Sequence, residues 1–346
     1  MDTSKKMAAG ITGVASFLWL AMTAAIAANQ RRLVFNPCII PEVDSPRSTG
    51  HRTRPVVLRA RDGTRLCGWL LTPLVQGPRP AVMYFGGRSE EVSWVARDAG
   101  KLFPGMTVLA MNYRGYGQSH GTPDELLMID DGCTLFDWLA ALGQVDAARI
   151  AVVGRSLGSG VAVQVAKERP VNSVVLITPY DSILAIAKRR FRVMPIEYML
   201  RHRFESIKHA PSLKAPTYVL RAASDDVVPH SHTDQLVGKL ATLAGDDTVP
   251  ASDHMNIPYL EATQALIAGF LTRRFAQAAG LPQAPQPNTA AVLAEVGPEV
   301  GPKLILEAGP ESAPIAASAA RDATPTPLLP ATPLPSATVQ IAAFAK

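Results

Sequence analysis

Residues 152–162 read VVGRSLGSGVA and place Ser156 between Gly154 and Gly158. Two β-branched residues open this stretch and small residues close it, which predicts a strand, a sharp turn and then a helix. A serine in the pattern G-x-S-x-G at such a turn is typical of a nucleophile, because the turn projects the hydroxyl away from the sheet. A Cβ at either flanking glycine would strike the incoming strand or the outgoing helix. The competing interpretation is a tight turn that only requires glycines.

The chain around this turn alternates short apolar runs with helical patterns. The runs show little alternation between polar and apolar residues, which favours strands that are covered on both faces. Strands separated by helices predict an α/β fold with a mostly parallel, doubly wound sheet and helices on both faces. Reactive groups in such sheets gather beyond the carboxyl ends of the strands. The expected strands are 56–59, 66–71, 81–85, 107–111, 150–153, 173–177, 218–220 and 248–249.

A serine nucleophile needs a general base, and the base needs an acid that fixes its tautomer. In this architecture the order along the chain is serine, acid, histidine. Asp225 follows the seventh expected strand and is the predicted acid, whereas Asp226 is the alternative and is more typical of a solvated or helix-capping residue. His254 lies in a polar loop after the last expected strand, and we interpret it as the base rather than as a surface histidine. Asp253 is excluded as the acid because an adjacent residue cannot easily turn its carboxylate onto the same imidazole.

Two backbone amides are predicted to hold the developing oxyanion. The N–H of Leu157 follows the serine directly, where a new helix begins and places its positive dipole end. The second donor is expected from the loop after the third strand, which reads YFGGRSE at residues 84–90. Gly86 and Gly87 let the backbone approach a substrate closely, so the N–H of Arg88 is the predicted donor. Ser89 as the N-cap of the following helix is an alternative role for this loop that does not exclude the first.

The composition excludes several classes of function. A net charge of +5 on 346 residues is mild, and no long basic run with interleaved aromatic residues indicates nucleic-acid binding. Cys38, Cys67 and Cys133 form neither a CxxC pair nor a metal-ligand spacing, so we interpret them as buried small residues. The serine chemistry requires no metal and no organic cofactor. The sequence leaves the oligomeric state open.

Both ends of the chain differ from the middle. Residues 8–28 are uncharged and apolar, which fits the ~20 residues of a membrane-crossing helix. We expect residues 1–29 to form a membrane anchor; a cleaved signal peptide for export and a buried helix of the fold are the alternatives. Basic residues flank both sides, so the positive-inside rule hardly distinguishes the two orientations. We assign residues 30–50 to a linker, 51–280 to the catalytic domain, and 281–346, rich in Pro and Ala, to a disordered tail.

With these motifs the chain resembles the serine hydrolases of the α/β-hydrolase superfamily, and more closely the Bem46-like branch of membrane-anchored hydrolases with a minimal cap. The stretches that carry the resemblance are GRSLGSGVA, YFGGRSEEV, NYRGYGQSHGTP, SDDVVP, SDHMNIP and QRRLVFNP. The resemblance extends over residues 30–276 and implies that the NYRGYG loop supports the floor of the active site. Residues 86–88 read Gly-Gly-Arg where relatives often have His-Gly-Asn, so a backbone donor is kept while the side chains differ.

The segment between the sixth strand and the acid is basic. It carries Lys188, Arg189, Arg190, Arg192, Arg201 and Arg203 against a single glutamate, Glu197, and apolar residues are interleaved with them. One interpretation is a solvated pair of basic helices beside the site. The other is a surface that rests on anionic lipid and helps to admit an acyl chain.

The sequence therefore predicts hydrolysis of a carboxylic ester or thioester through an acyl-enzyme, with a small-molecule or lipid-like acyl substrate. Ser156 is the predicted nucleophile, His254 the general base and Asp225 the orienting acid. Fold does not dictate reaction, so a serine peptidase on the same fold remains an alternative. A catalytically inactive scaffold tethered to the membrane is the second alternative.

Overall fold

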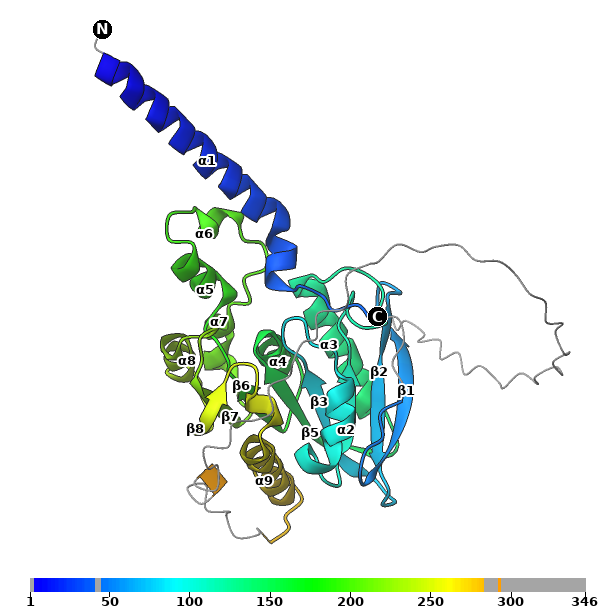
Figure 1. Ribbon diagram of the computed structural model, residues 1–346. Helices are drawn as coiled ribbons and strands as arrows, with labels where there is room; N and C mark the ends of the chain where they lie inside the picture. Colours follow the sequence, from blue (N-terminus) through cyan, green and yellow to red (C-terminus); the bar gives the residue numbers. More distant parts are fainter. Residues whose placement is uncertain (1–2, 41–44, 283–291, 294–346) are drawn as a thin grey trace, which may run out of the picture. The chain divides into compact units, whose positions relative to one another are not determined.

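The computed structural model describes residues 3–40, 45–282 and 292–293, with side chains from Thr12 onward. Its core is an eight-stranded sheet with the order β1-β2-β4-β3-β5-β6-β7-β8 (Figure 1). The strands are β1 (His51–Arg59), β2 (Arg65–Pro73), β3 (Arg79–Phe85), β4 (Thr107–Met111), β5 (Val145–Arg155), β6 (Ser173–Ile177), β7 (Thr217–Ser224) and β8 (Leu243–Asp253). Except for residues 281–282 and 292–293, the expected tail at 281–346 lies outside the described residues.

The sheet has the mostly parallel, doubly wound topology that the sequence predicts. From β3 to β8 every neighbouring pair is parallel, whereas β2 is antiparallel to both β1 and β4. The chain places β4 on one side of β3 and then returns to place β5 on the other side. Ligands of open α/β sheets bind at such a reversal, beyond the carboxyl ends of the strands. The carboxyl ends of β3 and β5 are therefore where a site is expected.

Helices cover both faces of the sheet, which is why its strands read as continuous apolar runs. Within β3, Val82 packs into a core with α2 and α9, whereas Met83 packs into a second core with α3 and α4. The helices of eight residues or more are α1 (Thr3–Val34), α2 (Ser93–Leu102), α3 (Glu125–Ala140), α4 (Leu157–Glu168), α5 (Ile183–Arg190), α8 (His230–Val237) and α9 (Glu261–Ala278). The shorter α6 (Ile196–Met199) and α7 (Ser206–His209) lie with α5 in the connection between β6 and β7.

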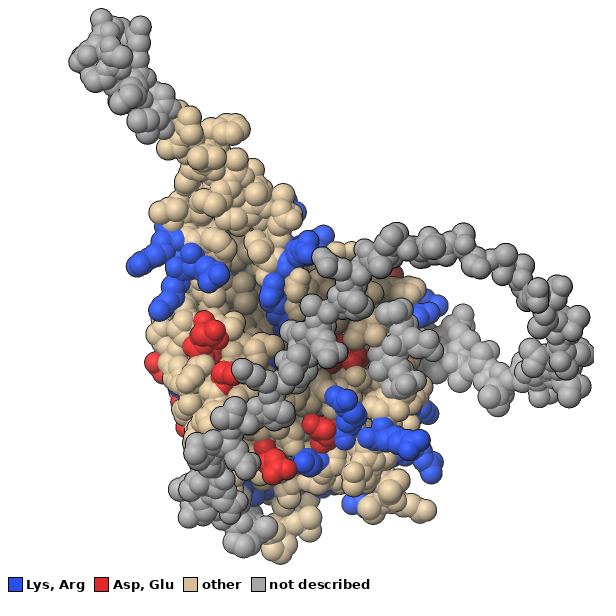
Figure 2. Space-filling model, in the orientation of Figure 1, with Lys and Arg blue, Asp and Glu red and all other residues tan. Residues whose placement is uncertain are grey.

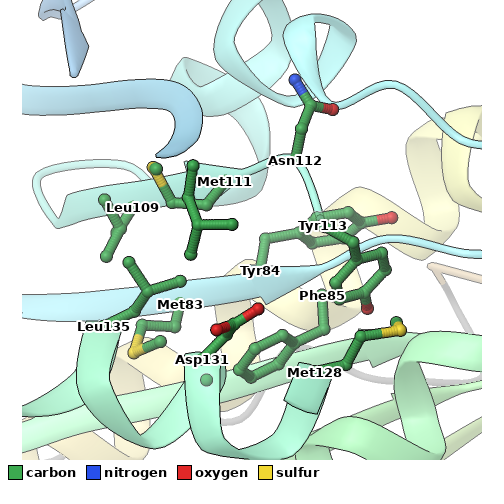
Figure 3. Close-up of a pocket in the computed structure, with 12 residues that line it drawn as sticks. Met83, Tyr84, Phe85, Leu109, Met111, Asn112, Tyr113, Met128, Asp131 and Leu135 are labelled. Carbon is green, nitrogen blue, oxygen red and sulfur yellow. The ribbon is translucent and has the colours of Figure 1, made fainter. Parts of the chain in front are cut away.

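The loop after β4 is fixed to the body of the fold by a buried cation. Arg114 donates to both carboxylate oxygens of Asp131 in α3, at 2.8 and 2.7 Å, and to Asp62 at 2.9 Å. Hydrogen bonds from the Thr64 backbone and from Arg114 lower the pKa of Asp62 to about 2. Figure 3 shows the Asp131 carboxylate beside a void between β3, β4 and α3. At about 10 Å³ this void is far too small for an organic substrate.

Candidate active site

Ser156 occupies the turn between β5 and α4, as the sequence predicts. Its backbone has φ +48° and ψ −117°, a strained combination for a residue with a side chain. The Ser156 N–H donates to the carbonyl of Ile177 at 2.9 Å, so the neighbouring strand β6 holds the turn. The serine therefore lies directly beyond the carboxyl end of the sheet, at the reversal beside β3.

The flanking glycines are required by close backbone contacts. A Cβ on Gly154 would lie 2.4 Å from the carbonyl oxygen of Gly158. A Cβ on Gly158 would lie 2.1 Å from the carbonyl oxygen of Phe85. Because both neighbours are backbone atoms, neither contact is relieved by a side-chain rotation. The two glycines thus bring the start of α4 against the end of β3.

The structure brings the three predicted side chains together in a hydrogen-bonded chain. The Nε2 atom of His254 lies 2.9 Å from the Oγ atom of Ser156. The Nδ1 atom of the same ring lies 3.0 and 2.9 Å from the two carboxylate oxygens of Asp225. The side chains of His254 and Asp225 are only 6% and 4% exposed, so water weakens these interactions little. This arrangement lets the imidazole accept a proton from the hydroxyl while the carboxylate holds the opposite nitrogen.

Asp225, rather than the neighbouring Asp226, contacts the His254 imidazole. Its Oδ1 atom also accepts hydrogen bonds from the backbone N–H groups of Val227 and Val228, at 3.0 and 2.7 Å. These bonds fix the carboxylate before any substrate arrives. Asp226 is exposed and lines the mouth of the adjacent cavity.

The two predicted amide donors face the same cavity as the serine. Gly87, Arg88, Ser156 and Leu157 all line it. Within the described part of the chain, the N–H groups of Arg88 and Leu157 have no protein acceptor. Leu157 is the first residue of α4, so its N–H belongs to the unpaired first turn of that helix. An oxyanion placed between these amides would supply the missing acceptor.

A buried carboxylate that the sequence analysis did not identify organises the loop after β3. The two oxygens of Glu90 accept from four donors, and each contact is between 2.6 and 2.8 Å. The donors are the Tyr84 hydroxyl, the Gly87 N–H, the Trp94 indole and the Arg155 guanidinium. Because Glu90 turns inward, α2 begins at Ser93 rather than at the expected residue 90.

Arg155, directly before the serine, extends this network to the histidine loop. Its Nη1 atom pairs with Glu90 at 2.7 Å, while its Nη2 atom donates to the carbonyls of His254 and Met255, at 3.0 and 3.3 Å. The Glu90 and Arg155 side chains are only 4% and 5% exposed. Glu90 and Arg155 lie 65 residues apart, and no local pattern in the sequence indicates that they pair.

The NYRGYG loop, residues 112–117 after β4, supports the site from below, as the family resemblance implies. The Tyr113 hydroxyl donates to the Gly86 carbonyl at 2.9 Å, and the Tyr116 hydroxyl donates to the Phe35 carbonyl. Ser89 is held from the same direction, because its N–H donates to Phe35 and its hydroxyl accepts from Asn36. Ser89 therefore positions the loop after β3 and does not cap α2.

The cavity above Ser156 has a volume of about 670 Å³ and is closed on one side by the end of α1. Helix α1 continues beyond the expected boundary at residue 29 and contributes Ile26, Ala27, Gln30, Leu33 and Val34 to the wall. The opposite wall comes from α5 and α6. The Leu33 carbonyl also accepts a hydrogen bond from Nε of Arg88 at 3.0 Å, which links the helix directly to the loop with the predicted amide donor.

In the described residues, no group of three His, Cys, Asp or Glu side chains could hold a metal ion. Cys38, Cys67 and Cys133 are free thiols, and Cys67 and Cys133 are buried. The polar groups that line the cavity include the Ser156–His254 pair, the N–H groups of Arg88 and Leu157, and side chains at the mouth of the cavity. Arg88, Arg190 and Asp226 are the charged groups at that mouth.

Comparisons with known proteins agree with this fold. A family model described as the α/β-hydrolase fold matches residues 85–195, which include the loop after β3 and the serine turn. An uncharacterized protein of Mycobacterium tuberculosis is 34% identical over 264 residues, covering 75% of this chain and 91% of the relative. An α/β-hydrolase domain-containing protein of Arabidopsis thaliana, WAV2, is 26% identical over 246 residues, covering 64% and 79%.

Solved structures share the architecture at low sequence identity. An acetyl xylan esterase from Paenibacillus sp. R4 has a TM-score of 0.54 at 21% identity, covering 66% of this chain and 86% of that protein. An esterase of Pyrococcus furiosus has a TM-score of 0.52 at 20% identity, covering 67% and 98%. At these identities the likeness establishes the fold and leaves the reaction to be argued from the site.

Proposed function

This chain belongs to the α/β-hydrolase fold family, and from that premise we propose that it is a serine hydrolase of carboxylic esters or thioesters. The observation that carries the proposal is the hydrogen-bonded chain from Ser156 through His254 to Asp225. Two free amides beside it add the second requirement of acyl transfer, a place for negative charge. A hydroxyl, a base, an acid and an anion site around one cavity favour catalysis over an inactive scaffold.

In the first half of the reaction, the hydroxyl oxygen of Ser156 attacks the carbonyl carbon of the substrate. His254 takes the hydroxyl proton as the new C–O bond forms, and the N–H groups of Arg88 and Leu157 hold the oxyanion. Asp225 stabilises the charged imidazole and keeps its own charge. The bond to the leaving group then breaks, and His254 gives its proton to the departing alcohol or thiol.

In the second half, water replaces the leaving group. His254 takes a proton from the water while the water oxygen attacks the acyl carbon. A second oxyanion therefore forms between the same two amides. The bond to Ser156 then breaks, the serine regains its proton and the carboxylic acid leaves. Every proton is carried by His254.

We also propose that α1 is an uncleaved single-pass anchor, as in the Bem46-like branch. Thr12–Val34 is the one stretch of the described chain long and apolar enough to cross a membrane, and a signal sequence near an N-terminus passes the same test. The cavity wall favours the anchor. Cleavage after Ala27 would remove Ile26 and Ala27 from that wall and would leave only the last turns of α1 to hold Arg88.

The proposal is tested by labelling the full-length protein with a fluorophosphonate, which reacts with activated serines. Wild type is expected to be labelled, Ser156→Ala is expected to be unlabelled, and exposed Ser231→Ala serves as the matched control. Hydrolysis of p-nitrophenyl esters, acyl thioesters and peptide anilides then separates an esterase from a peptidase. No Ser156-dependent labelling, or cleavage of anilides alone, contradicts the proposal.

A further inference from the structure

The segment containing α5 and α6, residues 183–200, runs beside α1 rather than over the sheet (Figure 1). The indole N–H of Trp19 donates to the Val193 carbonyl at 2.9 Å, and the Thr23 hydroxyl contacts the Met194 sulfur at 3.1 Å. Lower on the same helix, the side-chain oxygen of Gln30 accepts from the Arg201 N–H at 2.8 Å. Residues 193–201 therefore follow α1 from Trp19 to Gln30, over about three turns.

These contacts set the depth of the segment relative to a membrane. An α-helix rises about 1.5 Å per residue, so Trp19 lies roughly 20 Å along α1 from Leu33, which contacts Arg88. A crossing over Thr12–Val34, the stretch long and apolar enough for it, places both Trp19 and Thr23 inside the bilayer core. The tip of the 183–200 segment, at the level of Trp19 and Thr23, is then inside the boundary of the bilayer.

The surface chemistry at this tip matches that depth. Val193 is 73% exposed and Tyr198 is 89% exposed, and they lie on the segment that contacts the apolar face of α1. Trp and Tyr are enriched where membrane proteins pass through the headgroup region. Figure 2 shows Lys and Arg side chains gathered over α5 and α6 beside the uncharged surface of α1. Such cations lie at the headgroup level of anionic lipids while their stems stay in the apolar layer.

Helix α1 and this segment line the same cavity above Ser156. Ile26 and Ala27 of α1 and Ile186, Ala187 and Met199 of α5 and α6 contribute to its wall. These side chains are apolar, so this wall offers a path for a hydrocarbon chain and few partners for a polar one. Arg88 and Arg190 line the same cavity, and within the described residues neither forms an ion pair.

We propose that the substrate of this site is an acyl ester of an anionic glycerolipid in the membrane that holds α1. Its acyl chain reaches Ser156 sideways through the portal between α1 and residues 183–200. The headgroup phosphate stays near Arg88 and Arg190, and hydrolysis releases the fatty acid and the lyso-lipid alcohol. This inference rests on the proposed serine hydrolase function and names its substrate class.

The test narrows the portal in the full-length protein reconstituted in lipid vesicles. Ala27→Trp fills the α1 wall of the cavity, and Ala28→Trp places the same side chain on the neighbouring exposed residue of the helix. The measured quantity is the ratio of kcat/KM for p-nitrophenyl palmitate to that for p-nitrophenyl butyrate. Ala27→Trp is expected to lower this ratio by about tenfold or more, because a blocked path discriminates by chain length. Ala28→Trp is expected to leave the ratio within about twofold of wild type.

A lipid measurement identifies the source of the chain. Fatty acid release is followed in vesicles of phosphatidylcholine alone and of phosphatidylcholine mixed with phosphatidylglycerol. Faster release from the mixed vesicles, lost on raising the salt concentration, supports the anionic lipid. If Ala27→Trp does not fold, as judged by thermal unfolding and fluorophosphonate labelling, Ala187→Trp narrows the same portal from the opposite wall.

The failures of the two proposals are distinguishable. Wild-type protein that reacts with the fluorophosphonate and cleaves short esters, yet releases no fatty acid from either kind of vesicle, overturns the portal and leaves the hydrolase. An equal change of the chain-length ratio in the Ala27→Trp and Ala28→Trp variants also overturns the portal and leaves the hydrolase. Wild-type protein that shows no Ser156-dependent labelling overturns both.

Discussion

The carboxylate of Glu90 lies 2.7 Å from the guanidinium of Arg155, and this buried pair joins three segments of the candidate site. Through Glu90 it holds the Gly87 N–H in the loop after β3. Through Arg155 it holds the His254 carbonyl in the loop after β8. Ser156, the proposed nucleophile, is the next residue in the chain. A change in this pair is therefore expected to move the amide donor and the imidazole relative to the serine.

Removing one partner of this pair should cost both stability and rate. Glu90→Gln and Arg155→Met each leave a buried group without its counter-charge, which typically destabilises a fold by about 3–5 kcal/mol. A displacement of about 1 Å at the site can lower kcat by about 100-fold. The double variant should be more stable than the sum of the two singles predicts, because no unpaired charge remains. Urea unfolding and steady-state kinetics on a p-nitrophenyl ester measure both effects.

The matched control is the exposed pair of Lys101 and Glu261, whose side chains are 66% and 88% exposed. Glu261→Gln should change the free energy of unfolding by at most about 1 kcal/mol. If Glu90→Gln changes stability but leaves kcat at the wild-type value, the pair is structural and does not position the site.

The two neighbouring aspartates should differ sharply in their effect on turnover. Asp225→Asn removes the charge that stabilises the imidazolium and favours the wrong tautomer, so kcat should fall by about 10³–10⁴-fold. Asp226→Asn alters an exposed residue at the cavity mouth and should change kcat by less than about tenfold. Ester hydrolysis by the two variants, at equal concentrations of folded protein, measures the difference. Comparable losses in both variants would remove Asp225 from its proposed role.

A methyl group at the serine turn should be far more costly than one on an exposed loop. Gly158→Ala places a Cβ 2.1 Å from the Phe85 carbonyl oxygen, so the start of α4 must shift. Overpacking of this kind typically costs about 1–3 kcal/mol, and more where backbone must move. Gly143, where a Cβ meets nothing within 4 Å, provides the control. Thermal unfolding of Gly158→Ala and Gly143→Ala, together with Ser156 labelling, tests the contrast.

Acid should loosen the attachment of α1 to the fold through His202. This ring packs edge-on against Phe35, just after α1, and accepts from the Glu125 N–H at 3.4 Å. Burial lowers the pKa of His202 below 6.5; the Asp124 carboxylate opposes the shift, whereas Arg31 and Arg201 add to it. Because the lowered value belongs to the folded state, stability is full above pH 6.5 and declines as the pH falls from there through the folded-state pKa.

The corresponding measurement is the midpoint of thermal unfolding at buffer pH values from roughly 7.5 to 5. This range brackets the ordinary pKa of histidine. The midpoint of His202→Gln should fall less over this interval than that of wild type, because glutamine does not titrate. Parallel declines in the two proteins would assign the acid sensitivity to other groups.

The core of the fold was predictable because local patterns determine it. The runs at Thr107–Met111 and Ser173–Ile177 are apolar after their first residue, so strands buried on both faces were the direct interpretation, and both strands have these bounds in the structure. The three side chains that meet at the site were also predictable. In a doubly wound sheet the carboxyl ends of the strands lie at one edge, so the serine motif and the loops after the later strands pointed to Ser156, His254 and Asp225, with Asp226 as the alternative to Asp225.

Other parts of the site depend on contacts that no local pattern encodes. Glu90 and Arg155 are 65 residues apart, and neither belongs to a periodic pattern or a known spacing. The contribution of α1 to the cavity was missed for a different reason. An uncharged apolar helix near the N-terminus indicates a membrane by composition, and composition does not show that its last turns also face a substrate.

The bond between the Leu33 carbonyl and Nε of Arg88 would couple the proposed anchor mechanically to the proposed oxyanion site. A bilayer that is too thin or too thick for α1 changes the tilt of the helix, and this bond would pass the tilt to the loop that carries the Arg88 amide. A truncated, water-soluble fragment would then be a different catalyst, not merely an untethered one. Lipid thickness would act on turnover in the way that an effector acts on an ordinary enzyme.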